Sequence, residues 1–244
     1  LNSGNLTFSI ILKDEKNKKK GKLIKIHIVE PDLEKLVSSA VRKGHLRATA
    51  HPVSSDVFLI TVPTPINEKT RKPNLDFVFD ALVSIAKVLK RGDLVVLEST
   101  VPLGTTRSLS NKLSKLRPDL NFPHSYGDNA DVNIAHCPER VLPGKVLKEL
   151  RENDRIIGGL SAKCTDRAIK LYKIFVSGRC IGASSVEVAE MSKLTENSFR
   201  DLNIAFANEL SILCDEVGVS VWELIELANK HPRVNILQPG PGVG

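Results

Sequence analysis

The sequence predicts an α/β fold: a mostly parallel sheet with flanking helices, followed by an all-helical region. From residue 56 onward, short apolar runs rich in β-branched residues alternate with helical patterns, which implies right-handed strand–helix–strand crossovers. Residues 186–217 then contain no proline or glycine and keep a helical period. The chain has 244 residues, of which 41% are hydrophobic, and this is enough for the core of one such domain with a helical annex.

Four apolar runs are predicted to be buried strands because they are short and rich in β-branched residues: Asp56–Val62, Asp93–Glu98, Val132–Ala135 and Arg155–Ile157. A helix is expected at Leu75–Lys90, where the apolar side chains share one helical stripe and Gly92 closes the helix. Two further helices are expected at Thr105–Leu116 and Thr165–Phe175.

The helical region begins after a domain boundary that we place near Gly182–Ser185. Its first helix, residues 186–217, should end at Gly218. A second helix, Val221–Lys230, should stop before Pro232.

The net charge of +7 lies mainly in the first 25 residues, which hold seven lysines against Asp14 and Glu15 and so contribute +5. The remaining residues carry only +2 (7 − 5), so the folded part is nearly neutral and no nucleic-acid partner is expected. We interpret Lys16–Lys22 as a solvated tail, with an anion-binding arm as the alternative.

Other classes of protein are excluded by composition. No apolar run approaches the roughly eighteen residues of a membrane helix, so no membrane partner is expected. The four cysteines lack C-x-x-C spacing, which favours a reducing, cytoplasmic location, and no metal site is predicted.

Three polar loops follow predicted strands, at 63–65, 99–102 and 137–140. Each loop has a structural explanation, because proline ends a strand and a threonine there can bond to local backbone. In parallel sheets, however, ligands bind beyond the carboxyl ends of the strands, and these loops would share that edge. Thr64, Thr100 and Glu139 are therefore candidate site residues, with Glu139 as a candidate general base.

Two more clusters lie in the helical region. Lys193, Asn197 and Arg200 fall within about 60° of one another on the long helix, where a solvent-exposed polar stripe is the alternative. His231 and Arg233 precede the glycine-rich segment 240–244, where Arg233 could bind a phosphate and the alternative is a linker.

Seven motifs in this chain resemble, in the same order, those of the nucleotide-sugar 6-dehydrogenases, the UDP-glucose/GDP-mannose dehydrogenase family. They are 28–33, 62–65, 97–102, 136–144, 153–159, 190–209 and 231–244. The variant CPERVLPG at 137–144 indicates the branch that acts on UDP-N-acetylmannosamine. The resemblance implies an NAD-binding, Rossmann-like domain at 26–184, N-terminally incomplete after an unmatched leader at 1–25, and a central helical dimerisation domain at 185–244.

The resemblance also implies the chemistry and the residues. The family oxidises the C6 alcohol of a UDP-sugar to a carboxylate in two hydride transfers to NAD⁺. Thr64 and Thr100 would then line the cofactor site, Lys193 would be catalytic, and Glu139 would lie beside the reacting carbon. The substrate contacts implied are Arg140, Val141, Lys193, Asn197, Arg200, His231, Arg233 and Gly244. A homodimer through the long helix is the expected assembly.

The chain departs from the family pattern in two places. It has no G-x-G-x-x-G turn for the pyrophosphate, and the family's nucleophilic cysteine would come shortly after Gly244. We therefore expect an inactive internal fragment, with Cys137 as a buried spacer. Two alternatives stay open: a β-hydroxyacid dehydrogenase, which also carries a lysine and an asparagine on a long helix, and a non-catalytic dimerisation remnant.

Overall fold

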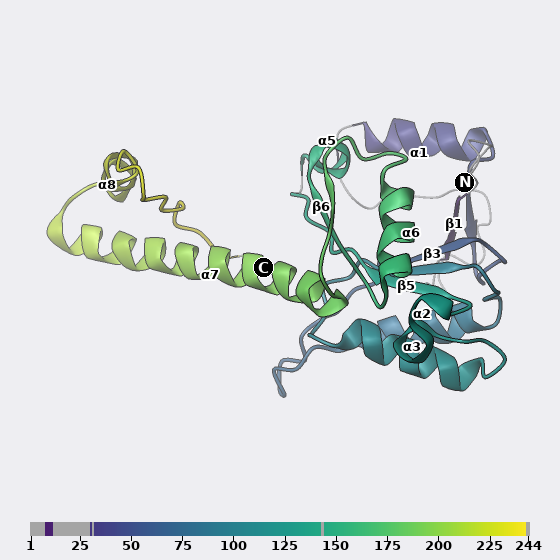
Figure 1. Cartoon of the computed structure of the whole chain (residues 1–244). Helices are drawn as coiled ribbons and strands as arrows, with labels where there is room; N and C mark the ends of the chain where they lie inside the picture. The colour runs from purple at the N-terminus through teal and green to yellow at the C-terminus, as the bar shows by residue number, and fades with distance from the viewer. Residues whose placement is uncertain (1–7, 12–29, 31, 143, 243–244) are drawn as a thin grey trace. The chain divides into compact units, whose positions relative to one another are not determined.

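A computed structural model of the chain describes residues 8–11, 30, 32–142 and 144–242 (Figure 1). Predictions for Lys16–Lys22 and Gly244 concern positions outside these residues. The chain divides into two compact units, Leu1–Glu190 and Met191–Gly244. None of the described helices combines the length and apolar character needed to cross a membrane.

The described part of the first unit contains a sheet with the strand order β3-β4-β5-β6-β7. Its strands are β3 (Val57–Ile60), β4 (Leu94–Leu97), β5 (Asn133–His136), β6 (Arg155–Gly159) and β7 (Cys180–Gly182). All four predicted strands are present, and β7 was not predicted. Neighbouring strands run parallel except β5 and β6, which are antiparallel.

The antiparallel pair follows from a short connection. Between β5 and β6 the chain makes a loop and only the seven-residue helix α5 (Val146–Glu152), so β6 starts at the edge where β5 ends. The start of β6 therefore lies at the same edge as the ends of β3, β4 and β5. Arg155, the first residue of β6, is brought to the edge where the site was predicted.

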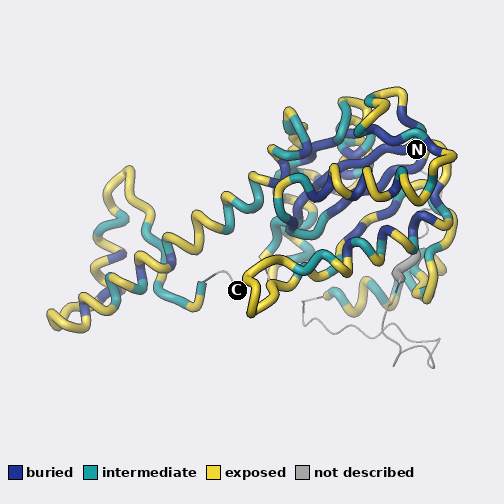
Figure 2. Tube along the Cα trace, turned by 90° about the horizontal axis from the view of Figure 1, so that it is seen from below, coloured by how far each residue is buried: buried dark blue, intermediate teal, exposed yellow. Residues whose placement is uncertain are grey.

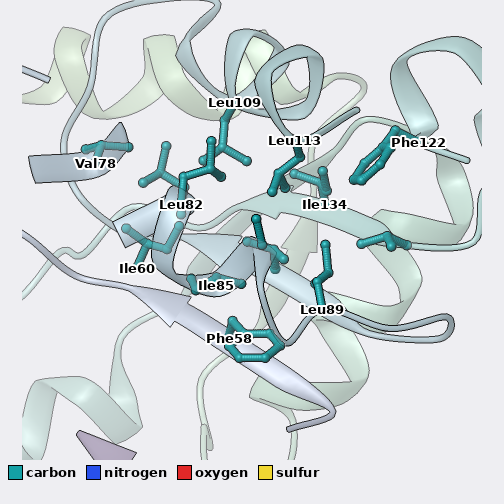
Figure 3. Packing of buried hydrophobic residues seen from close by; sticks show 14 of the residues in the cluster. Phe58, Ile60, Val78, Leu82, Ile85, Leu89, Leu109, Leu113, Phe122 and Ile134 are labelled. Carbon is teal, nitrogen blue, oxygen red and sulfur yellow. The ribbon is translucent and has the colours of Figure 1, made fainter. Parts of the chain in front are cut away.

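Helices cover both faces of this sheet. On one face, α2 (Asp76–Ala86) and α3 (Thr105–Leu116) pack against the strands, with Leu82 and Leu109 among the residues that make up this core (Figure 3). On the other face, α6 (Ala162–Tyr172) contributes Ala168 and Tyr172 to a second core. Successive residues of β4 belong alternately to the two cores, as the two-residue period of a strand requires.

Several elements were not predicted. They are α1 (Leu33–Arg42), β2 (Leu46–Thr49), α4 (Pro123–Tyr126), the 3₁₀ turn η2 (Gly127–Asn129) and α5. The strand β1 (Phe8–Ile11) was also not predicted, and it pairs in parallel with β2. The apolar run FSII pairs with β2, which lies about 38 residues further along the chain, so the pairing depends on the tertiary fold.

The long helix α7 (Val186–Val217) has the bounds that the sequence predicted. Its first turn belongs to the first unit, because a Cβ at Gly158 would lie 2.6 Å from the Ser185 carbonyl oxygen and 2.8 Å from the Ala189 Cβ. The Glu190 carboxylate accepts hydrogen bonds from the Gly104 and Thr106 backbone N–H groups at 2.6 and 2.8 Å. The compact units thus divide inside the helix, after Glu190, rather than before it.

The second unit consists of the rest of α7, the helix α8 (Val221–Ala228) and a C-terminal segment that folds back (Figure 1). Its core is small: Ala207, Cys214, Val221 and Ile225 are buried together. Most of the surface of α7 is intermediate or exposed (Figure 2).

Candidate functional site

The loops after β3 and β4 are joined by hydrogen bonds at the carboxyl edge of the sheet. The Thr64 Oγ1 donates to the Thr100 carbonyl oxygen at 2.7 Å, and the Ser99 Oγ donates to the Val62 carbonyl oxygen at 2.6 Å. The structure therefore brings together two residues predicted to line the cofactor site. Their contact follows directly from the parallel register of β3 and β4.

The third loop, 137–145, lies beside the second. The Glu139 backbone N–H donates to the Glu98 carbonyl oxygen at 3.4 Å, and the Glu139 carboxylate accepts a hydrogen bond from the Val141 N–H. The Arg140 Nη1 donates to the Asp154 carbonyl oxygen at 3.0 Å, while the Asn153 amide donates to the Arg140 carbonyl oxygen at 2.9 Å. The residues just before β6 thus hold the loop that carries Glu139, Arg140 and Val141.

Behind this loop lies a polar cluster that sequence reasoning missed. The Tyr172 hydroxyl, on α6, donates to the Glu98 carboxylate, and the buried Arg155 guanidinium lies 5.7 Å from the Tyr172 ring centroid. Burial raises the pKa of Glu98, while Tyr172 and Arg155 partly oppose that shift. The sequence offered one signal of this cluster, a carboxylate at the end of a buried strand. It gave no sign that Glu98 pairs with Tyr172, which lies 74 residues away along the chain.

Cys137 belongs to the same cluster and is fully buried, as predicted. Burial raises the pKa of its thiol to about 12, and the nearby Glu98 carboxylate adds to the shift. Because the thiolate is the nucleophilic form, this cysteine is unsuited to covalent catalysis at neutral pH.

In the second unit, Lys193, Asn197 and Arg200 occupy one face of α7, as their spacing predicted. Lys193 and Asn197 are half-buried and Arg200 is exposed. Among the described residues, no hydrogen bond or ion pair uses any of these three side chains, which leaves an ammonium, an amide and a guanidinium available to a ligand.

The glycine-rich segment runs back along α7, held by asparagine side chains. The Asn208 side chain exchanges two hydrogen bonds with the backbone of Gly240, at 2.8 and 2.9 Å, and Asn229 does the same with Ile236, at 2.7 and 2.9 Å. Two residues beyond Gly240, a Cβ at Gly242 would lie 2.9 Å from Asp201 Oδ1, and its φ of +89° also favours glycine. The chain therefore runs antiparallel to α7, in the direction of Asn197.

His231 and Arg233 precede this segment and are both exposed. The His231 Nδ1 accepts a hydrogen bond from the Arg233 backbone N–H at 3.3 Å. The Arg233 guanidinium has no hydrogen bond or ion pair to any residue that the structure describes.

We expect Asn208→Ala to release the C-terminal segment from α7. Losing two backbone contacts should cost roughly 1–3 kcal/mol, since each hydrogen bond contributes about 0.5–1.5 kcal/mol. Amide hydrogen exchange at residues 236–242 should become faster, and the matched control is Asn203→Ala, whose side chain bonds, among the described residues, only to the Phe199 carbonyl oxygen of the same helix. Equal exchange rates in the two variants would show that the segment is held in another way.

The NAD binding domain of the UDP-glucose/GDP-mannose dehydrogenase family matches residues 4–176, and the central domain of the same family matches residues 187–244. The chain belongs to the UDP-glucose/GDP-mannose dehydrogenase family. The resemblance drawn from the sequence motifs is thereby confirmed, and NAD is the cofactor of the first domain.

Individual members of this family are very similar in sequence to this chain. An NDP-N-acetyl-D-galactosaminuronic acid dehydrogenase of Ralstonia nicotianae is 63% identical over 90% of this chain and 52% of its own length. A UDP-N-acetyl-D-mannosamine dehydrogenase of Campylobacter jejuni is 62% identical over 90% of this chain and 54% of its own length. The chain thus spans about half the length of the curated relatives it matches.

A solved structure has the same fold. The UDP-N-acetyl-mannosamine dehydrogenase of Staphylococcus aureus has a TM-score of 0.84 and is 39% identical, over 98% of this chain and 56% of the other. The fold class predicted for this member of the dehydrogenase family is therefore confirmed.

The residues of the first unit fit part of an NAD site. The hydrogen-bonded loops of Thr64 and Thr100 lie beyond the carboxyl ends of two adjacent parallel strands, where dinucleotides bind in this type of fold. The described residues include no G-x-G-x-x-G turn, so the pyrophosphate contacts are not assigned to them.

Proposed function

We propose that this chain is part of an NAD-dependent dehydrogenase that oxidises the C6 alcohol of a UDP-2-acetamido sugar, UDP-N-acetyl-D-mannosamine, to the uronate. One observation carries the proposal: relatives with this activity in their names are 59–62% identical over 90% of the chain. The product would serve cytoplasmic synthesis of surface polysaccharide precursors.

The chain's own residues divide the chemistry between them. NAD⁺, when bound, would supply the hydride acceptor, and Thr64 and Thr100 would contact it. The Lys193 ammonium stabilises the negative charge that develops on the sugar oxygen during oxidation. The Glu139 carboxylate, held by the Val141 N–H, orients the water that completes the conversion to the acid.

The remaining candidates bind the sugar nucleotide. Asn197 and Arg200 extend the Lys193 face with a neutral and a cationic donor, and Arg233, whose guanidinium has no partner among the described residues, would bind the diphosphate. We assign the other substrate contacts to Arg140, Val141, His231 and Gly244.

Activity in a full-length enzyme containing this chain tests the function. UDP-N-acetyl-D-mannosamine should give two NADH per sugar and should be preferred to UDP-N-acetyl-D-galactosamine and UDP-glucose. Turnover of a small β-hydroxyacid, with no turnover of any UDP-sugar, would favour the alternative dehydrogenase. Preference for the galactosamine sugar would retain the reaction and change the substrate, as the name of the Ralstonia relative suggests.

Arg233→Lys should weaken UDP-sugar binding roughly tenfold, although it keeps the charge, because a lysine cannot donate two parallel hydrogen bonds to a diphosphate. NAD⁺ affinity should be unchanged, since Thr64 and Thr100 belong to the other unit. Isothermal titration of both ligands measures this, with the exposed Arg42→Lys as control. Equal UDP-sugar affinity in the two variants would remove Arg233 from the binding site.

We also propose that α7 forms a homodimer interface. Five apolar side chains on one stripe of the helix are more than half exposed: Phe199, Leu202, Phe206, Leu213 and Val217. If the same stripe of a second copy packed against it, both apolar stripes would be removed from water. Native mass measurement should give a dimer, and a dimer with no affinity for NAD⁺ or UDP-sugar would favour the non-catalytic alternative.

A further inference from the structure

Glu30 is a buried carboxylate that the reaction described above does not use. Only 9% of its surface is exposed, and a buried carboxylate is costly unless hydrogen-bond donors surround it. Among the described residues, two backbone N–H groups from far along the chain donate to Glu30. The Gly144 N–H donates to one carboxylate oxygen at 2.8 Å, and the Val146 N–H donates to the other at 2.7 Å.

Both donors lie where the loop after β5 enters α5. The first N–H groups of a helix have no partner inside the helix, and the Lys145 side chain, at the N-cap of α5, makes no capping bond. Glu30 therefore satisfies amides that the local sequence leaves without an acceptor. Its own segment is fixed in turn, because the Leu33 N–H donates to the Glu30 carbonyl oxygen at 3.3 Å at the start of α1.

Glu30 completes a set of three carboxylates that hold this loop. The Val141 N–H bonds to Glu139, and the Leu142 N–H bonds to the Glu149 carboxylate at 2.8 Å. The acceptors for Val141 and Leu142 lie two and seven residues away along the chain, whereas Glu30 lies 114 and 116 residues from its donors. Of the three carboxylates, Glu30 alone ties the loop to a distant part of the first unit.

We infer that Glu30 is a positioning residue for the substrate loop: it fixes Glu139, Arg140 and Val141 through the amides of Gly144 and Val146. This inference rests on the proposed function, which gives those three residues their contacts with the sugar nucleotide. Glu30 itself touches neither substrate nor cofactor. Its loss should therefore weaken the enzyme's use of the sugar and leave its use of NAD⁺ unchanged.

The test compares Glu30→Gln with Glu34→Gln, which removes the same charge from an exposed residue four positions along the chain. A glutamine can accept at one position only and presents its NH₂ group to the second amide. Hydrogen exchange at Gly144 and Val146 should therefore be about 10- to 100-fold faster in Glu30→Gln and unchanged in Glu34→Gln. Equal exchange in both variants would overturn the inference.

Kinetics of the full-length enzyme give the second readout. In Glu30→Gln the KM for UDP-N-acetyl-D-mannosamine should rise about tenfold and kcat should also fall, because the loop carries Glu139, while the KM for NAD⁺ stays within about twofold. General destabilisation would instead lower the active fraction, and hence kcat, without raising the KM for the sugar. Glu30→Asp keeps the charge on a shorter side chain, so it should give an intermediate KM, and it replaces Glu30→Gln in both measurements if the latter does not fold.

The outcomes separate the two proposals. Faster exchange with an unchanged sugar KM would show that Glu30 holds the loop without positioning substrate, and this would overturn the inference. If the wild-type enzyme uses no UDP-sugar, the proposed function fails, and the exchange rates still decide whether Glu30 holds the loop.

Discussion

Lys193→Ala should lower kcat of the full-length enzyme by about 10²- to 10³-fold with little change in KM. Removing one preorganised donor to a developing oxyanion costs on the order of 2.7–4 kcal/mol of transition-state stabilisation. Lys193 suits this role because it is half-buried and its ammonium has no partner among the described residues. Its positive charge matters most as negative charge appears on the sugar oxygen, so the loss should fall on kcat.

Steady-state kinetics with UDP-N-acetyl-D-mannosamine measure this effect, with Lys170→Ala as the control. Lys170 is an exposed lysine on α6, and its removal should leave both constants unchanged. A higher KM with unchanged kcat for Lys193→Ala would make Lys193 a binding residue only.

The free energy of unfolding should fall by about 3 kcal/mol between pH 6.5 and pH 4 because of one side chain, His136. His136 is 1% exposed at the end of β5. Burial lowers its pKa from 6.5 to about 4, and a backbone interaction with Leu97 opposes the shift only in part. Between these two values the unfolded chain binds a proton that the folded chain excludes, so stability is present above pH 6.5 and is lost as the pH falls.

Chemical denaturation across this pH range, in the wild type and in His136→Phe, isolates the contribution. The variant cannot titrate at this position, so its stability should fall less steeply with acid, and the difference between the two curves removes the effect of all other groups. His51→Phe is the matched control, because His51 is exposed. Parallel curves for the wild type and His136→Phe would contradict the prediction.

Local pattern was enough to predict the elements on which the site is built. The apolar runs gave the four strands, and the absence of proline and glycine gave α7 its bounds. Those elements in turn predicted that Thr64 and Thr100 would meet, because neighbouring parallel strands end at one edge. The spacing of Lys193, Asn197 and Arg200 likewise determined that they share one face of a helix.

Elements with weak patterns were missed. β7 has three residues and α5 has seven, which is too short for a period to emerge. β1 has four residues, and no strand was predicted there.

The sequence by itself thus determined the family, the strands that frame the cofactor edge and the polar face of α7, since each depends on residues close together in the chain. The tertiary structure alone decided the direction of β6 and the pairing of Tyr172 with Glu98, 74 residues apart. It alone also joined Glu30 to the loop of Glu139, and Asn208 to Gly240. A buried carboxylate or amide must find partners, but which partners it finds depends on the path of the whole chain, and no local period encodes that path.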